Sequence, residues 1–76
     1  MRVKVVLHSV LREKLPHEAQ GVAYLELGVG GRLSNVLEHF GIEYGMCAVN
    51  GQLERDSSRS LQDGDEVRVF ARVAGG

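Results

Sequence analysis

The sequence predicts an α+β fold in which one helix packs on one face of a mixed sheet of four or five strands. Three observations predict it. Apolar and polar residues alternate near both ends of the 76-residue chain, residues 33–40 have helical periodicity, and Asn50–Gly51 is a hairpin signal. A chain of this length forms one small domain, which leaves no room for a deep pocket.

The first third of the chain predicts a pair of strands. Val3, Val5 and Leu7 recur at every second position, which is typical of a strand with one buried face. Residues 10–15 change rhythm before Pro16, so we expect a short helical turn or a wide loop there. A second alternating segment, residues 22–27, pairs most simply with the first as an antiparallel hairpin.

One main helix is predicted in the middle of the chain. Four apolar residues at spacings i, i+3, i+4 and i+7 form a single helical stripe, namely Leu33, Val36, Leu37 and Phe40. Ser34 is the candidate N-cap, and Gly41 is placed to end the helix in a left-handed conformation.

The remaining strands follow the helix. Residues 47–49 and 52–53 flank Asn50–Gly51 and predict a short hairpin. After the turn Asp63–Asp65, apolar residues alternate from Val67 to Val73 and predict the last strand. The order strand, strand, helix, hairpin, strand leaves the sheet face opposite the helix open to solvent or to a partner.

The printed sequence ends with Gly75 and Gly76. Because glycine has no Cβ, such a segment can enter a channel that is too narrow for bulkier residues, and it can present a carboxylate to another protein's active site. A frayed chain end is the alternative interpretation. We expect a folded domain over residues 1–73 and a flexible tail over residues 74–76.

Composition argues against several classes of protein. The 9 basic and 10 acidic residues give a net charge of -1, so no strong field attracts nucleic acid or an anionic membrane. Cys47 is the single cysteine, which excludes an internal disulfide and fits the reducing cytoplasm. No apolar run has the length that spans a bilayer.

Residues with catalytic or ligand chemistry form no recognised constellation. Cys47 lies in a predicted strand, where a small thiol behaves as a core residue. No base accompanies the serines Ser57, Ser58 and Ser60, and no metal-ligand spacing links the histidines His8, His17 and His39. The glycine-rich turn Gly28–Gly31 lacks the lysine of a phosphate-binding loop. We therefore expect no metal site and no enzyme activity.

Four segments carry a resemblance to a known family: Leu11–Glu13, Val49–Gly51, Leu61–Val67 and Val73–Gly76. They span nearly the whole chain and resemble the ubiquitin-like β-grasp sulfur carriers represented by MoaD and ThiS. The first segment is more similar to MoaD than to the shorter ThiS chains. Residues 70–72 read Phe-Ala-Arg where MoaD usually has Phe-Pro-Pro, and residues 32–33 read Arg-Leu where the family commonly has Thr-Val.

The resemblance implies a chemistry for the end of the chain. In such families the carboxylate of the last glycine, here Gly76, is adenylated and then becomes a thiocarboxylate, while Gly75 and Ala74 allow close approach. An anionic carboxylate reacts poorly with nucleophiles, which explains the need for activation. The implied partners are an adenylating enzyme related to ubiquitin activators, which uses ATP and magnesium, and a sulfur donor protein. The chain itself binds no cofactor.

Several outcomes for the sulfur stay open. The resemblance implies molybdopterin (molybdenum cofactor) or thiamine biosynthesis, with a molybdopterin synthase large subunit or a thiazole synthase as a further partner. One alternative is a ubiquitin-like protein modifier that is conjugated through Gly76. Another is a β-grasp interaction subunit whose tail is never activated.

The alternation of the last strand also predicts a docking surface. Arg68, Phe70 and Arg72 fall on the face opposite the helix, and Val6 and His8 have the matching parity on the first strand. We expect an apolar spot ringed by basic groups at the base of the tail, where a partner docks.

Overall fold

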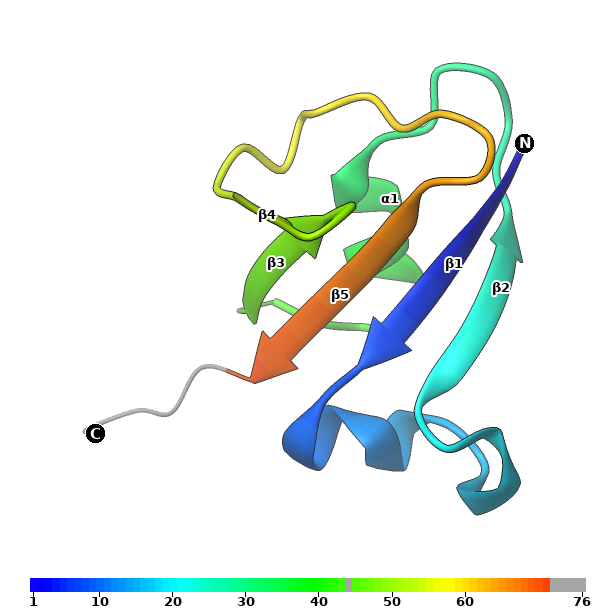
Figure 1. The fold of residues 1–76 in the computed structure, drawn as a ribbon, viewed down its shortest axis with the longest axis vertical. Coiled ribbons are helices and arrows are strands. Elements are labelled where there is room, and N and C mark those ends of the chain that lie inside the picture. The colour runs from blue at the N-terminus through cyan, green and yellow to red at the C-terminus, as the bar shows by residue number, and fades with distance from the viewer. Residues whose placement is uncertain (44, 72–76) are drawn as a thin grey trace.

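The computed structural model describes residues 1–43 and 45–71 of the chain. The elements in order are β1 (Arg2–Leu7), the 3-10 helices η1 (Ser9–Lys14) and η2 (His17–Ala19), β2 (Val22–Glu26), α1 (Leu33–His39), β3 (Gly45–Val49), β4 (Gln52–Glu54) and β5 (Glu66–Ala71) (Figure 1). No helix within these ranges is long and apolar enough to cross a membrane.

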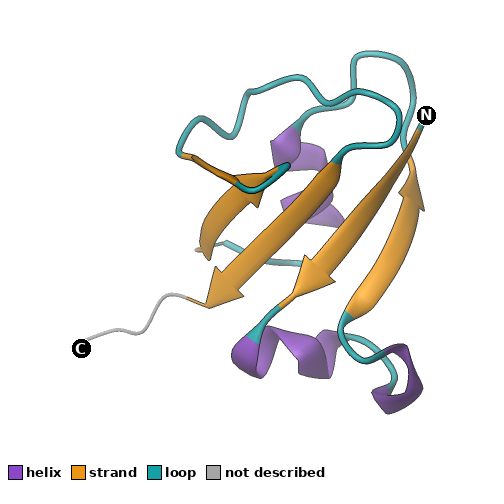
Figure 2. Cartoon of the chain, in the orientation of Figure 1, coloured by secondary structure: helices purple, strands orange, loops and turns teal. Residues whose placement is uncertain are grey.

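The strands form a five-stranded sheet in the order β2-β1-β5-β3-β4, and α1 covers one face of it (Figure 2). Strand β1 is antiparallel to β2 and parallel to β5, whereas β3 is antiparallel to both β5 and β4. The mixed sheet with one main helix confirms the α+β prediction, and the β1–β2 and β3–β4 hairpins are also confirmed.

The core lies between α1 and the two central strands. The valines of β1 and β5 that alternate toward the helix are at most 1% exposed, as are Leu33 and Val36 of α1. These strand residues are Val3, Val5, Val67 and Val69. The alternating side chains of the strands and the apolar stripe of the helix therefore pack in one layer. In the described part of the chain, no helix covers the other face of the sheet.

The candidate cap residue Ser34 does not cap the helix. Ser34 lies inside the first turn, because α1 begins at Leu33 and Arg32 is the extended residue before it, with φ of -123°. The N–H of Ser34 donates to the carbonyl of Ser57 at 2.8 Å, and Asn35 Oδ1 accepts from the N–H of Arg32 at 2.8 Å. A distant loop thus accepts from the N–H of Ser34, which a capping side chain could have served, and the side chain of Asn35 accepts from the residue before the helix.

The predicted end of the helix is confirmed. Gly41 has a φ of 66°, in the left-handed region. Its N–H donates to the carbonyl of Glu38 at 3.1 Å, and the N–H of Ile42 donates to the carbonyl of Leu37 at 2.9 Å. These two hydrogen bonds form a Schellman motif, which turns the buried Ile42 back toward the helix.

Hydrogen bonds tie the β3–β4 turn to the start of β5. Asn50 and Gly51 have φ values of 52° and 85°, as a type I′ turn requires. Asn50 Nδ2 donates to Asp65 Oδ1 at 2.9 Å, while Asn50 Oδ1 accepts from the N–H of Glu66 at 2.9 Å. Asp65 Oδ2 also accepts from the N–H of Gln62 at 2.8 Å. The side chain of Asp65 therefore has a structural role.

The Asp63–Asp65 turn before β5 is tied to β1. The N–H of Arg2 donates to Asp63 Oδ1 at 2.7 Å, and the N–H of Gly64 donates to the carbonyl of Arg2 at 2.8 Å. Gly64 has a φ of 86°, which favours glycine. The Asp63–Asp65 segment thus holds the two central strands in register, which fixes the position of the end of β5.

Candidate functional site

The residues that the sequence analysis places at the reacting end of the chain lie outside the described ranges. They are Arg72, Ala74, Gly75 and Gly76. The strand that leads toward them is β5, which ends at Ala71 opposite Gly45 of β3. The part of the candidate site that the structure describes is therefore the sheet surface along β5 and its neighbours.

Three of the predicted docking residues lie together. His8 follows β1, and its ring stacks on the ring of Phe70 with centroids 4.3 Å apart and an interplanar angle of 14°. Arg68 Nη1 lies 3.2 Å from His8 Nε2. Because a guanidinium can only donate, His8 Nε2 accepts in this contact. Arg68 Nε also donates to Glu66 Oε1 at 2.8 Å.

The expectation for Val6 needs a correction. Val6 lies on the predicted face, opposite Arg68 in the β1–β5 register, but it is only 9% exposed. It belongs to a central strand and also pairs with Val22 of β2, so neighbouring side chains flank it from both sides. Val6 is largely covered by neighbouring side chains and offers little area to a partner.

Two apolar residues that the sequence analysis missed extend the surface. Met46 of β3 lies directly opposite Phe70 and is 50% exposed, and Leu53 of β4 is 54% exposed. Leu53 shares the face because it pairs with Ala48, which in turn pairs with Arg68. We call the residues His8, Met46, Leu53, Arg68 and Phe70 the open sheet face. The alternation of side chains on either side of the Asn50–Gly51 turn could have placed both Met46 and Leu53 on this face.

The remaining candidates behave as core or surface residues. Cys47 is 4% exposed within the apolar core, and burial raises the pKa of its thiol, so the reactive thiolate is disfavoured at neutral pH. This confirms the prediction of a core cysteine. His17 lies in η2 and His39 in α1, and residues 1–43 and 45–71 contain no group of three or more His, Cys, Asp or Glu that could hold a metal ion.

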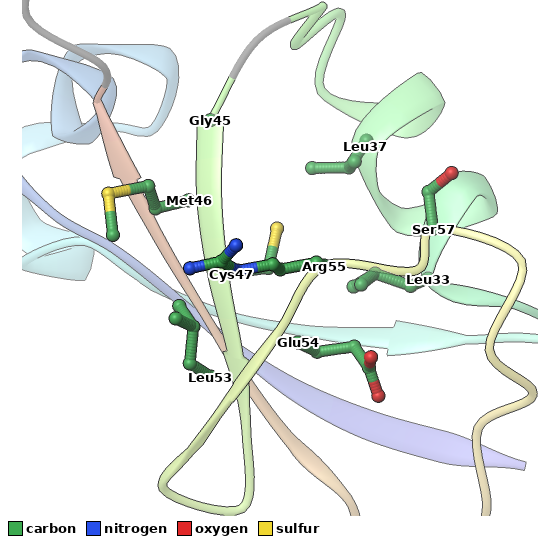
Figure 3. A pocket seen from close by; sticks show the side chains of 9 residues that line it. All are labelled: Leu33, Leu37, Gly45, Met46, Cys47, Leu53, Glu54, Arg55 and Ser57. Atoms are coloured by element: carbon green, nitrogen blue, oxygen red, sulfur yellow. The ribbon is translucent and has the colours of Figure 1, made fainter.

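A hollow of about 410 Å³ lies at the β3–β4 edge of the sheet (Figure 3). It is lined by side chains of α1, of β3 and of the segment that follows β4. The hollow opens at the surface beside the open sheet face, with which it shares Met46 and Leu53.

Comparisons with known proteins agree with this architecture. The model of the ThiS family matches residues 11–76. No curated protein sequence matches the chain significantly.

Solved structures with the same fold cover almost the whole chain. A Pyrococcus furiosus protein assigned as molybdopterin converting factor, subunit 1, has a TM-score of 0.75 and 23% identity, and the match covers 96% of this chain and 99% of that one. SAMP1, a small archaeal modifier protein from Haloferax volcanii, has a TM-score of 0.77 and 15% identity, with 100% of both chains covered.

A third similar structure is a complex of subunits 1 and 2 of the molybdopterin-converting factor from Helicobacter pylori. The matched chain has a TM-score of 0.65 and 21% identity, with 100% of both chains covered. At these identities the three structures establish the ubiquitin-like β-grasp fold and leave the biochemical role to be argued separately.

Proposed function

Because the chain belongs to the ThiS family, we propose that it is a sulfur carrier whose last glycine, Gly76, is adenylated and then thiocarboxylated by partner proteins. The observation that carries the proposal is the extent of the family match, which runs from residue 11 through Gly75 and Gly76. The match thus covers the β-grasp body from η1 onward and the segment that we propose to react.

The chemistry divides between this chain and its partners. The carboxylate of Gly76 attacks the α-phosphorus of ATP and releases pyrophosphate. Hydrosulfide delivered by a donor protein then attacks the acyl carbon, which forms the C–S bond of the thiocarboxylate, breaks the C–O bond to the phosphate and releases AMP. The partner enzyme supplies ATP, magnesium and the groups that stabilise the transferred charge. The chain supplies the carboxylate, a narrow Ala74–Gly76 segment and a folded surface that a partner recognises.

We propose that the open sheet face is the surface on which the adenylating enzyme docks. Phe70, Met46 and Leu53 form an exposed apolar stretch across three neighbouring strands, and it adjoins the end of β5. Arg68 lies beside this stretch and gives it a basic margin. An apolar centre with a polar margin is the usual composition of a recognition surface.

The proposed acceptor of the sulfur is a larger synthase subunit in molybdopterin biosynthesis, with thiamine biosynthesis as the alternative pathway. The similarity to subunit 1 of molybdopterin converting factors supports the first, and in the Helicobacter pylori structure that subunit is bound to subunit 2. The ThiS family match supports the second. The similarity to SAMP1 supports a further candidate function, conjugation through Gly76 to other proteins.

Mass spectrometry tests the proposal. The intact protein is incubated with its adenylating enzyme, ATP, magnesium and a sulfur donor, and parallel samples lack ATP or the donor. We expect the mass change of one oxygen replaced by sulfur, located at Gly76 by fragmentation, only in the complete mixture. The absence of both an adenylate and a thiocarboxylate from that mixture would refute the sulfur-carrier proposal. Conjugates of higher mass on an immunoblot of a tagged chain would favour the modifier instead.

A further inference from the structure

The hollow at the edge of the sheet is large enough to hold a side chain of a partner. Its inner wall is apolar and comes from Leu33 and Leu37 of α1 together with Cys47 of β3 (Figure 3). Its volume of about 410 Å³ exceeds that of an aliphatic side chain and falls in the range of small binding clefts. We call this hollow the edge groove. It lies on the helix side of β3, whereas Met46 points to the other side (Figure 3).

Within residues 1–43 and 45–71, no strand pairs with the backbone at Gly45 on the side of the edge groove. The N–H of Asn50 donates to the carbonyl of Glu66 at 2.8 Å, so even-numbered residues of β3 form their hydrogen bonds with β5. Odd-numbered residues, Gly45 and Cys47 among them, therefore direct their backbone groups toward the β4 side. The last residue of β4, Glu54, pairs with Cys47, and β4 has no residue opposite Gly45. An extended segment could continue the sheet at this place.

The rim of the edge groove carries a cation. Glu54 is held in an ion pair with Arg59, with Nη1 3.0 Å from Oε1. Arg55 is exposed and, among residues 1–43 and 45–71, has no carboxylate within ion-pair distance. Arg55 therefore leaves positive charge at the mouth, and the exposed Ser57 adds a hydroxyl.

We propose that the edge groove binds an extended peptide segment of a partner protein that carries an aliphatic side chain next to a carboxylate. The segment pairs with the backbone at Gly45, its aliphatic side chain contacts Leu37, and its carboxylate binds Arg55. This site is separate from the reaction at Gly76 and does not depend on sulfur transfer.

A defined peptide tests the proposal. The probe is an acetylated and amidated hexapeptide of four aliphatic residues followed by two aspartates, titrated into the isotope-labelled protein and followed by NMR. We expect shifts of the amides of Gly45 and Cys47 and of the methyl groups of Leu37. A second peptide with lysines in place of the aspartates should bind about tenfold more weakly, because Arg55 then repels it.

Variants separate this site from the docking surface. Arg55→Glu should weaken binding of the aspartate peptide by about tenfold or more, whereas Lys14→Glu, which changes the charge equally on η1, should leave it unchanged. Phe70→Asp should also leave peptide binding intact. The proposal is overturned if the peptide shifts no signals in the edge groove, or if Arg55→Glu and Lys14→Glu bind it equally well. A failure of thiocarboxylation at Gly76 would affect neither result.

Discussion

Phe70→Ala is the substitution that most directly probes the open sheet face. Phe70 is partly covered within the chain by the stacked ring of His8, and 37% of the residue remains exposed. If the adenylating enzyme docks there, binding covers this remaining area. Replacement by alanine should then slow activation of the carrier at limiting concentration while the fold persists.

The size of the effect follows from the exposed area. A phenylalanine side chain buries about 200 Å² when it is fully covered, so the 37% that remains exposed corresponds to about 70 Å². At about 25 cal/mol per Å², covering it contributes about 2 kcal/mol, which equals a factor of about 20 in kcat/KM. Alanine retains its Cβ, so we expect a loss of about ten- to twentyfold. The lost stack with His8 costs about 1 kcal/mol of unfolding free energy.

The assay is ATP-dependent pyrophosphate exchange catalysed by the adenylating enzyme at increasing carrier concentration. Tyr24→Ala is the matched control, because Tyr24 is an exposed aromatic residue on the same sheet face but lies on β2, with β1 between it and β5. We expect Tyr24→Ala to change kcat/KM by less than about twofold. Thermal unfolding of both variants verifies that they are folded at the assay temperature.

An unchanged kcat/KM for folded Phe70→Ala would remove the open sheet face from the docking model. Equal losses for Phe70→Ala and Tyr24→Ala would also contradict it, because a general effect on the sheet would then explain both. Neither outcome bears on whether Gly76 is the reacting residue.

Further substitutions test the structural reasoning. Asp65→Ala removes two side-chain hydrogen bonds and should lower the unfolding free energy by about 2 kcal/mol in urea titrations. Gly21→Ala should lower the melting temperature by about 10 °C or more, since a Cβ would lie 2.6 Å from the carbonyl oxygen of Leu7 at a φ of 78°. The hydroxyl and N–H of Ser58 hydrogen-bond Asp56 and lower the pKa of its carboxyl. The charged form of Asp56 therefore stabilises the fold at pH values above the ordinary aspartate pKa. Asp56→Asn should be less stable than the native protein at neutral pH, and the two stabilities should converge in acid. Equal stabilities at neutral pH would contradict this.

Local patterns predicted most of the fold. Alternation at Val3–Leu7, the helical stripe and the Asn50–Gly51 turn each depend on neighbours in the sequence, and all three predictions are confirmed. The hydrogen bonds at the start of α1 could not all be predicted from the sequence, because one partner is not local. The carbonyl of Ser57, more than twenty residues away, accepts from the N–H of Ser34.

The candidate site was predicted only in part, because it depends on how the strands are ordered. Parity correctly placed His8, Arg68 and Phe70 on one face. Parity alone could not show that β1 is central, which is why Val6 is buried. Met46 was missed because its place beside Phe70 is set by the β3–β5 register, a contact between distant segments.

The central claim is that the carboxylate of Gly76 is the reagent and that the folded domain presents it. The most direct test compares the native chain with a chain that carries one alanine after Gly76, both reacted with the adenylating enzyme, ATP and the sulfur donor. Fragmentation mass spectrometry should find sulfur at Gly76 of the native chain and no sulfur on the extended chain. Equal sulfur incorporation or equal delivery of sulfur to the acceptor by both chains would contradict the claim.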